Sequence, residues 1–199
     1  MKKEILDGYI GVKFEAHCVQ SAVPQSVADL YDTFRTSGER LDRYGMAPAN
    51  GGNMSLRLED GFVVTASGAN LGIIEPDELI WVQKCDVDNK SVHYRGSIKP
   101  SSETILHYLV LEARGEAGAV VHAHDPKVTS EAIASDDLTE TVREEPYGTI
   151  ELANLAIEAF GRNEDIIVLR NHGYVCAGNN MPEVVDSIIA THDRLLEYK

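Results

Sequence analysis

Val120-Val121-His122-Ala123-His124-Asp125 is the stretch from which the rest of the chain can be interpreted. It ends an apolar run with two histidines two positions apart. Because side chains alternate between the two faces of a strand, His122 and His124 should point the same way. Neutral imidazole is the commonest metal ligand, so the pair could supply half of a divalent-metal site. A buried structural histidine beside a surface histidine is the alternative, and further ligands are needed to decide.

Composition limits the class of protein. The chain has 199 residues, 43% hydrophobic and 25% charged, which predicts one substantial domain over residues 1–199 with a well-buried core. The net charge of −14 disfavours nucleic acid and anionic membranes as partners. No apolar run approaches the roughly 18 residues of a transmembrane helix, and no signal peptide is evident. Cys18, Cys85 and Cys176 lack CxxC spacing, which indicates free thiols in a reducing compartment, the cytoplasm.

Hydrophobic periodicity predicts alternating strands and helices. Turn residues such as Glu59-Asp60-Gly61 separate short strands, and such short connections favour antiparallel pairing. The expected strands are a weak one at 9–14 and further ones at 54–58, 62–66, 79–83, 91–94, 118–124, 166–169 and 174–177. The expected helices cover 26–44, a segment after Ser101, a short stretch at 128–135, 149–160, and the segment from Pro182 onward.

His172 provides a third candidate metal ligand. It follows a strand of branched apolar residues and precedes a glycine, a place where chains commonly carry functional groups. With His122 and His124 it would complete three neutral nitrogen ligands, the pattern of a catalytic metal with an open position. We expect the other four histidines to be structural or exposed: His17, His93, His107 and His192.

Glu103 begins a helix directly after Ser101 and Ser102. The structural alternative is that an acidic residue in the first turn suits the helix dipole. The two hydroxyl groups and the free backbone N–H groups would also suit a phosphate. The glycine-rich loop 50–55 and the segment 65–68 offer further donors, although each alone is an ordinary turn.

Taken together, these clusters resemble the class II aldolase/adducin family, from about Ser26 to Lys199. Residues 1–23 have no clear counterpart in the family. The resemblance rests on five clusters in the family's order and spacing: Gly52-Asn53-x-Ser55, Ser67-Gly68, Pro100-Ser101-Ser102-Glu103, His122-x-His124 and Asn171-His172-Gly173.

The resemblance implies a role for each of these residues. The family's metal ligands, usually of Zn²⁺ but also of Mn²⁺, Co²⁺ or Mg²⁺, would be His122, His124 and His172. Glu103 would be the acid/base group and could reach the metal when substrate is absent. The phosphate cradle would comprise Gly52, Asn53, Ser67, Gly68, Ser101 and Ser102. The implied fold is a three-layer α/β/α sandwich on a mostly antiparallel central sheet, and the implied assembly is a homotetramer.

The family includes L-fuculose-phosphate aldolase, ribulose-phosphate 4-epimerase, methylthioribulose-phosphate dehydratase and the adducin heads, which lack the metal site. Our first expectation is a metal-dependent aldehyde-lyase, an aldolase that cleaves a phosphorylated ketose to dihydroxyacetone phosphate and an aldehyde. An epimerase or a dehydratase on the same scaffold is the alternative. The presence of all three histidines and Glu103 argues against a non-catalytic, adducin-like binding module.

A second proton carrier is harder to place. Fuculose-phosphate aldolases use a tyrosine in the region after the His-x-His pair, and here no tyrosine occurs between Asp125 and Tyr147. A phenol donates a proton at neutral pH without perturbation, whereas a glutamate needs a raised pKa. Tyr147 is therefore the expected second catalytic group, with Glu144 as its alternative.

Overall fold

A computed structural model describes residues 13–125, 138–161 and 164–197. Its centre is one eight-stranded sheet with the strand order β1-β5-β4-β3-β2-β6-β8-β7. Every neighbouring pair is antiparallel except β1 and β5, which run parallel. The strands are β1 (Glu15–Gln20), β2 (Asn53–Leu58), β3 (Gly61–Thr65), β4 (Leu79–Asp86), β5 (Ser91–Arg95), β6 (Ala119–Ala123), β7 (Ile166–Leu169) and β8 (Gly173–Gly178).

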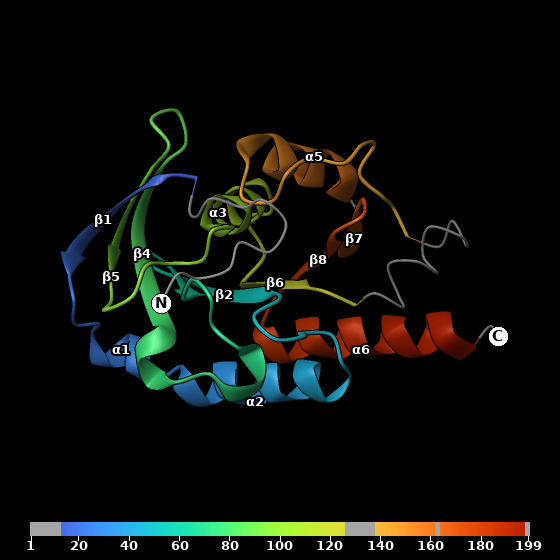
Figure 1. Ribbon diagram of the computed structural model, residues 1–199, viewed down its shortest axis with the longest axis horizontal. Coiled ribbons are helices and arrows are strands. Elements are labelled where there is room, and N and C mark those ends of the chain that lie inside the picture. Colours follow the sequence, from blue (N-terminus) through green and yellow to red (C-terminus); the bar gives the residue numbers. More distant parts are fainter. Residues whose placement is uncertain (1–12, 126–137, 162–163, 198–199) are drawn as a thin grey trace, which may run out of the picture.

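Helices cover both faces of this sheet, which makes three layers (Figure 1). On one face lie α2 and α6, and on the other lie α3 and α5. The helices are α1 (Gln25–Ala28), α2 (Tyr31–Arg43), α3 (Thr104–Ala113), α5 (Ile150–Phe160) and α6 (Met181–Glu197), with short 3₁₀ turns η1 (Leu71–Ile73) and η2 (Pro76–Glu78). The expected α/β/α sandwich on a mostly antiparallel sheet is confirmed.

Alternation along β6 decides which layer receives the first histidine. Val121 packs in the apolar cluster shared with α2 and α6, and Val120 packs in the cluster shared with α3 and α5. His122 is two residues after Val120, so its side chain points to the α3/α5 side. The start of α3 carries Glu103, and the fold therefore brings these two side chains to the same layer.

Most expected elements match the structure to within a few residues, and two do not. The helix expected at 26–44 is interrupted: α1 ends at Ala28 and α2 begins at Tyr31. The first described strand, β1, covers 15–20, where no strand was expected; of the strand expected at 9–14, residues 13 and 14 form a bend and residues 9–12 lie outside the described residues. The short helix expected at 128–135 also lies outside them.

The described end of the N-terminal segment joins the fold. β1 pairs with β5 at the edge of the sheet, and Phe14 is buried among residues of the α3/α5 side. The ammonium group of Lys13 lies 5.6 Å from the centre of the Tyr147 ring. The segment thus reaches a residue that we expected to be catalytic.

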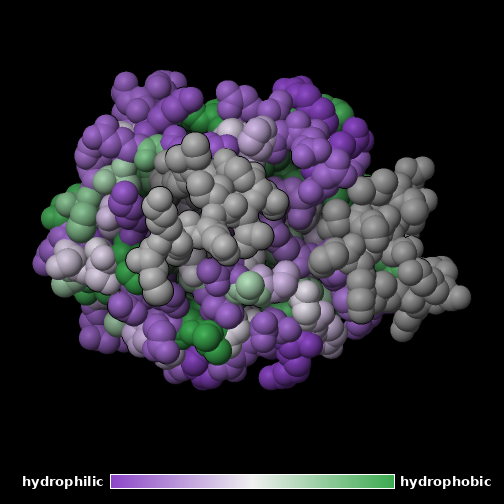
Figure 2. All heavy atoms as spheres, in the orientation of Figure 1, coloured by the Kyte–Doolittle hydropathy of each residue, from purple (hydrophilic) through white to green (hydrophobic). Residues whose placement is uncertain are grey.

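The described surface is largely hydrophilic. Figure 2 shows hydrophobic residues on the viewed face as separate small areas among hydrophilic ones. Within the described part of the chain, the helices are all too short or too polar to cross a bilayer.

Candidate metal centre and active site

The three histidines converge with Glu103 at the end of β6. His122 belongs to β6, His124 follows that strand, His172 lies in the turn between β7 and β8, and Glu103 immediately precedes α3. One ligand atom from each of the four lies within 4.8 Å of the others. The imidazole rings are separated by 4.6 to 4.8 Å between their centroids. Residues far apart in sequence thus form one compact set of nitrogen and oxygen ligands.

Hydrogen bonding selects the nitrogen that His122 presents to this set. Its Nδ1 lies 3.0 Å from the backbone carbonyl oxygen of Tyr174. A carbonyl only accepts, so Nδ1 carries the proton and Nε2 keeps its lone pair. That Nε2 lies 2.7 Å from His124 Nε2 and 3.2 Å from Glu103 Oε2. A backbone partner behind a ring is the usual way in which proteins orient a metal-binding histidine.

The surroundings hold these rings in the neutral form that a metal requires. Burial, reinforced by the neighbouring His124 and His172, places the pKa of His122 well below its usual value. Burial and the nearby His172 lower the pKa of His124 to about 4. Both side chains are therefore available as neutral ligands at physiological pH.

Glu103 completes the set of ligands, and only one of its two carboxylate oxygens has a hydrogen-bond partner. The side chain is 3% exposed, and its Oε2 accepts a hydrogen bond of 2.8 Å from Asn53 Nδ2. Its Oε1 is buried without a hydrogen-bond partner and lies 4.0 Å from His172 Nε2. A buried carboxylate oxygen without a hydrogen-bond partner is costly unless a cation or a substrate proton meets it. Three imidazole nitrogens and a carboxylate oxygen fit a divalent metal such as zinc.

The turn that carries His172 is shaped by close approach. A side chain at Gly173 would lie 2.4 Å from the Ala123 backbone oxygen and 3.1 Å from the His122 ring, so only glycine fits there. Asn171 adopts a left-handed φ of 56°, and its Nδ2 donates a 2.9 Å hydrogen bond to Glu144. These contacts hold His172 against β6.

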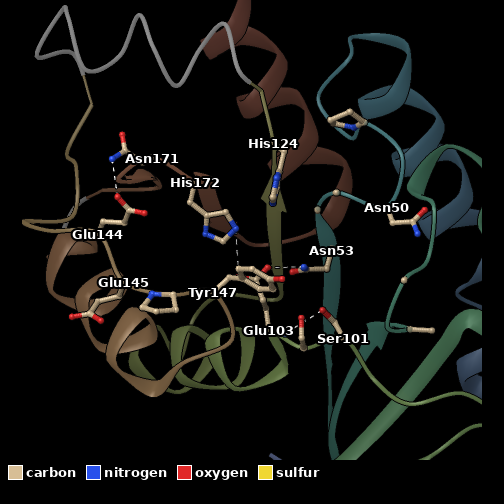
Figure 3. Close-up of a pocket in the computed structure, with 17 residues that line it drawn as sticks. Asn50, Asn53, Ser101, Glu103, His124, Glu144, Glu145, Tyr147, Asn171 and His172 are labelled. Atoms are coloured by element: carbon tan, nitrogen blue, oxygen red, sulfur yellow. Dashed lines mark hydrogen bonds and ion pairs between the residues drawn. The ribbon is translucent and has the colours of Figure 1, made fainter. Parts of the chain in front are cut away.

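A pocket with a volume of about 1140 Å³ opens over this cluster (Figure 3). Glu103, His124 and His172 line it, while fully buried His122 lies beneath. Tyr147 is also in the lining, and its ring centroid is 5.9 Å from that of His172. Among the described residues, neither lysine nor arginine lines the pocket. A phosphate group bound there would meet neutral donors, as the resemblance implies.

The structure places most of the expected phosphate residues at this pocket. Those in its lining are Gly52, Asn53, Gly68, Ser101 and Ser102. Ser67 is exposed and outside the lining, and its backbone N–H donates to Lys99. Ser101 Oγ accepts a 3.2 Å hydrogen bond from the Glu103 backbone N–H, so this hydroxyl already has a partner. The Asn53 amide likewise faces Glu103.

Sequence reasoning assigned no site role to His107, grouping it with the structural or exposed histidines. The structure buries it completely, 2.5 Å from Asn53 Oδ1 and 2.7 Å from Ser55 Oγ. Burial lowers the pKa of His107 to about 4. A sign in the sequence is its spacing from Glu103, since residues four apart lie on one helix face.

The family described as Class II Aldolase and Adducin N-terminal domain matches residues 34–196. The chain belongs to the class II aldolase/adducin family. The solved structure of an L-fuculose 1-phosphate aldolase superposes with a TM-score of 0.72, covering 88% of this chain and 85% of the other, at 21% identity. At that identity the superposition shows the shared fold alone.

Two curated relatives in this family are methylthioribulose-1-phosphate dehydratases. The one from Gluconacetobacter diazotrophicus is 43% identical over 89 residues, 44% of this chain and 41% of its own length. The one from Pseudoalteromonas translucida is 30% identical over 74% of this chain and 80% of its own length. A third relative, from Rhodospirillum rubrum, is a 5-methylthioribulose-1-phosphate/5-deoxyribulose-1-phosphate aldolase, 25% identical over 81% of this chain and 76% of its own length. The match spans less than half of the first relative.

These relatives overturn the expectation of a fuculose-phosphate type of aldolase that releases dihydroxyacetone phosphate. Their names favour the dehydratase that stood as an alternative. The reason for the error is chemical. A base and a metal beside a ketone serve both reactions, because each passes through negative charge on a carbon next to that ketone. Which bond then breaks is not encoded in the family's metal-binding and serine clusters.

Proposed function

We propose that this protein is a metal-dependent dehydratase of a phosphorylated ketose, with 5-methylthioribulose 1-phosphate as the leading candidate. The observation that carries the proposal is the unpartnered Glu103 Oε1, buried beside three histidines at a polar pocket. The dehydratase names of the relatives support the reaction and the substrate.

Glu103 is the proposed base. Elimination of water from a ketose begins with removal of the proton on the carbon between the ketone and the leaving hydroxyl. Oε1 takes that proton, and the electron pair of the broken C–H bond forms a double bond with the adjacent carbon. The C–O bond of the hydroxyl on that carbon breaks, and the hydroxide departs. The enol that remains loses its O–H proton and gains a proton on the far carbon, which gives the second carbonyl group. A divalent cation held by the three imidazoles would stabilise the negative charge on the ketone oxygen.

Tyr147 is the proposed acid that completes the elimination. A departing hydroxide needs a proton to leave as water, and a phenol, which is protonated at neutral pH, can supply one. Tyr147 lines the pocket beside His172.

Binding of the phosphate is assigned to the start of α3 and to two glycine-containing loops. The helix N-terminus carries partial positive charge and free N–H groups, which favour an anion. Ser101, Ser102, Gly52 and Gly68 line the pocket next to it. Asn53 donates to Glu103 and Ser67 lies outside the pocket lining, so we do not assign direct phosphate contacts to these two residues.

Product analysis tests the reaction. With a divalent metal and 5-methylthioribulose 1-phosphate, we expect a dicarbonyl phosphate, followed by ¹H and ³¹P NMR, and no dihydroxyacetone phosphate. Glu103→Gln keeps the side-chain shape and removes the base, so the rate should fall about 10²- to 10⁴-fold with metal retained. Stoichiometric release of dihydroxyacetone phosphate would overturn the proposal, as would no turnover with any divalent ion.

Zinc is the proposed native metal, with Mn²⁺, Co²⁺ or Mg²⁺ as alternatives, because three imidazoles and a carboxylate suit zinc best. We also propose a single domain, supported by the one sheet that runs through the described residues. The free thiols of Cys18, Cys85 and Cys176 support a reducing compartment, the cytoplasm.

A homotetramer is the proposed assembly, supported by the family alone, whose members are often oligomeric. Sedimentation should give about four times the chain mass of 21.8 kDa. A 21.8 kDa species alone would refute it.

A further inference from the structure

Behind Glu103 lies a chain of hydrogen bonds that ends away from the pocket. Asn53 Nδ2 is 2.8 Å from Glu103 Oε2, and Asn53 Oδ1 is 2.5 Å from His107 Nε2. The other nitrogen of that ring, Nδ1, is 2.7 Å from Ser55 Oγ. All four side chains are buried, with exposed fractions of 6% for Asn53 and at most 3% for the rest. Water therefore cannot readily reach these groups and replace a partner in any of these hydrogen bonds.

The chemistry of the groups gives the chain one direction. The Glu103 carboxylate accepts, so Asn53 must present its NH₂ group to it. The amide oxygen then faces His107 and can only accept, so Nε2 of that ring must carry a proton. A neutral imidazole has one proton, which leaves Nδ1 as an acceptor for the Ser55 hydroxyl. The carboxylate thus fixes the orientation of the Asn53 amide, and the amide in turn fixes which nitrogen of His107 carries the proton.

A reversed Asn53 amide would place its oxygen against Glu103 Oε2, and two acceptors would then face each other in a buried site. The carboxylate would lose its 2.8 Å hydrogen bond and could rotate about its side chain. In the structure, Oε1 is buried without a hydrogen-bond partner, 4.0 Å from His172 Nε2. After such a rotation, the position of Oε1 would no longer be fixed. The Nε2–H of His107 is the group that excludes this reversal.

We propose that His107 is a positioning residue that acts on the catalytic carboxylate through Asn53. It holds the amide in one orientation, the amide holds Glu103 Oε2, and Oε1 is left facing the metal ligands and the pocket. The inference rests on the base role of Glu103 in the proposed function, but it does not depend on which bond the reaction breaks.

Two substitutions separate positioning from simple filling of space. In His107→Gln, the side-chain amide nitrogen can occupy the place of Nε2 and donate to Asn53. In His107→Asn, the shorter amide reaches only the place of Nδ1, keeps the Ser55 contact and loses the donor to Asn53. Both variants are neutral and polar, and both remove the ring, so their effects on folding should be similar.

We expect His107→Gln to keep kcat within about fivefold of the unsubstituted protein, whereas His107→Asn should lower kcat at least about fiftyfold. For both, KM should change less than about threefold and metal content should stay normal, since neither substrate groups nor metal ligands are altered. Equal loss of kcat in the two variants, at equal melting temperature, would show a merely structural histidine and overturn the proposal.

A second measurement needs neither turnover nor a folded variant. In the unsubstituted, metal-free protein at pH 7, long-range ¹H–¹⁵N NMR correlations should show His107 protonated at Nε2 and bare at Nδ1. The opposite tautomer, or a doubly protonated ring, would overturn the proposal. A failed dehydratase assay with this tautomer present would instead count against the proposed function alone.

Discussion

His122 and His107 are both completely buried, yet their ring nitrogens have opposite surroundings. His107 has both nitrogens bonded to protein groups, Asn53 and Ser55. His122 has one nitrogen on the Tyr174 carbonyl and the other facing His124 and Glu103. Burial therefore does not distinguish the proposed metal ligand, His122, from the proposed positioning residue, His107. The distinction lies in whether the second nitrogen has a partner of its own or faces other ligands.

The strongest test of this comparison removes the ligand. His122→Ala should reduce metal content from about one ion per chain to near zero and lower turnover at least about 10³-fold, because the metal contributes several kcal/mol to catalysis. His107→Gln is the matched control, a buried histidine whose loss should leave metal content unchanged. Elemental analysis and kinetics measure both, and equal metal loss in the two variants would erase the distinction.

The pH dependence of the unfolding free energy tests the buried surroundings of His107 and needs no activity assay. The lowered pKa of His107, about 4, means that the unfolded chain binds a proton there below its usual pKa of about 6.5 while the folded chain does not. The unfolding free energy should therefore fall as the pH drops from about 6.5 to about 4, by about 3 kcal/mol from this group.

Denaturant titrations of metal-free protein at a series of pH values measure this loss. His107→Gln should show a smaller decrease over the same range, since the remaining slope comes from other groups such as His122 and His124. Identical pH dependence in the variant and the unsubstituted protein would contradict the account.

On the pocket side of the cluster, Tyr147→Phe should slow product formation at least about tenfold, roughly 1.4 kcal/mol of barrier. Exchange of the substrate proton next to the ketone should survive, because that step uses Glu103. Tyr108→Phe is the control, since Tyr108 packs on Phe62 outside the pocket. Unchanged kinetics in Tyr147→Phe would favour Glu144, the alternative donor, which also lines the pocket.

The smallest expected effect concerns the phosphate. Ser102→Ala should raise KM for the phosphorylated substrate about fivefold, about the value of one neutral hydrogen bond, while metal content stays normal. Competition by inorganic phosphate should weaken in parallel. If KM rises equally for an unphosphorylated analogue, Ser102 does not bind the phosphate.

Local sequence patterns predicted the positions of many strands and helices. The two-residue turn at Glu59-Asp60 and the branched run at 166–169 placed the strands correctly, because side-chain alternation and turn chemistry are local properties. The interruption between α1 and α2 was missed, because apolar spacing continues across it. Leu30 and Tyr31 there pack against the cluster on the α2/α6 side. β1 was not predicted, because its pairing partner, β5, is about 75 residues away along the chain.

Some features of the candidate site likewise follow from local sequence, and others depend on tertiary packing. By itself, the sequence determined that His122 and His124 share a face, since two-residue spacing in a strand has that consequence whatever surrounds it. Only the tertiary structure decided that Oε1 of Glu103 would lack a partner, that His172 would close over β6 beside Gly173, and that His107 would stand behind Asn53. These outcomes depend on where separate strands and a helix start meet, and hydrogen-bond partners in a buried site are set by that packing.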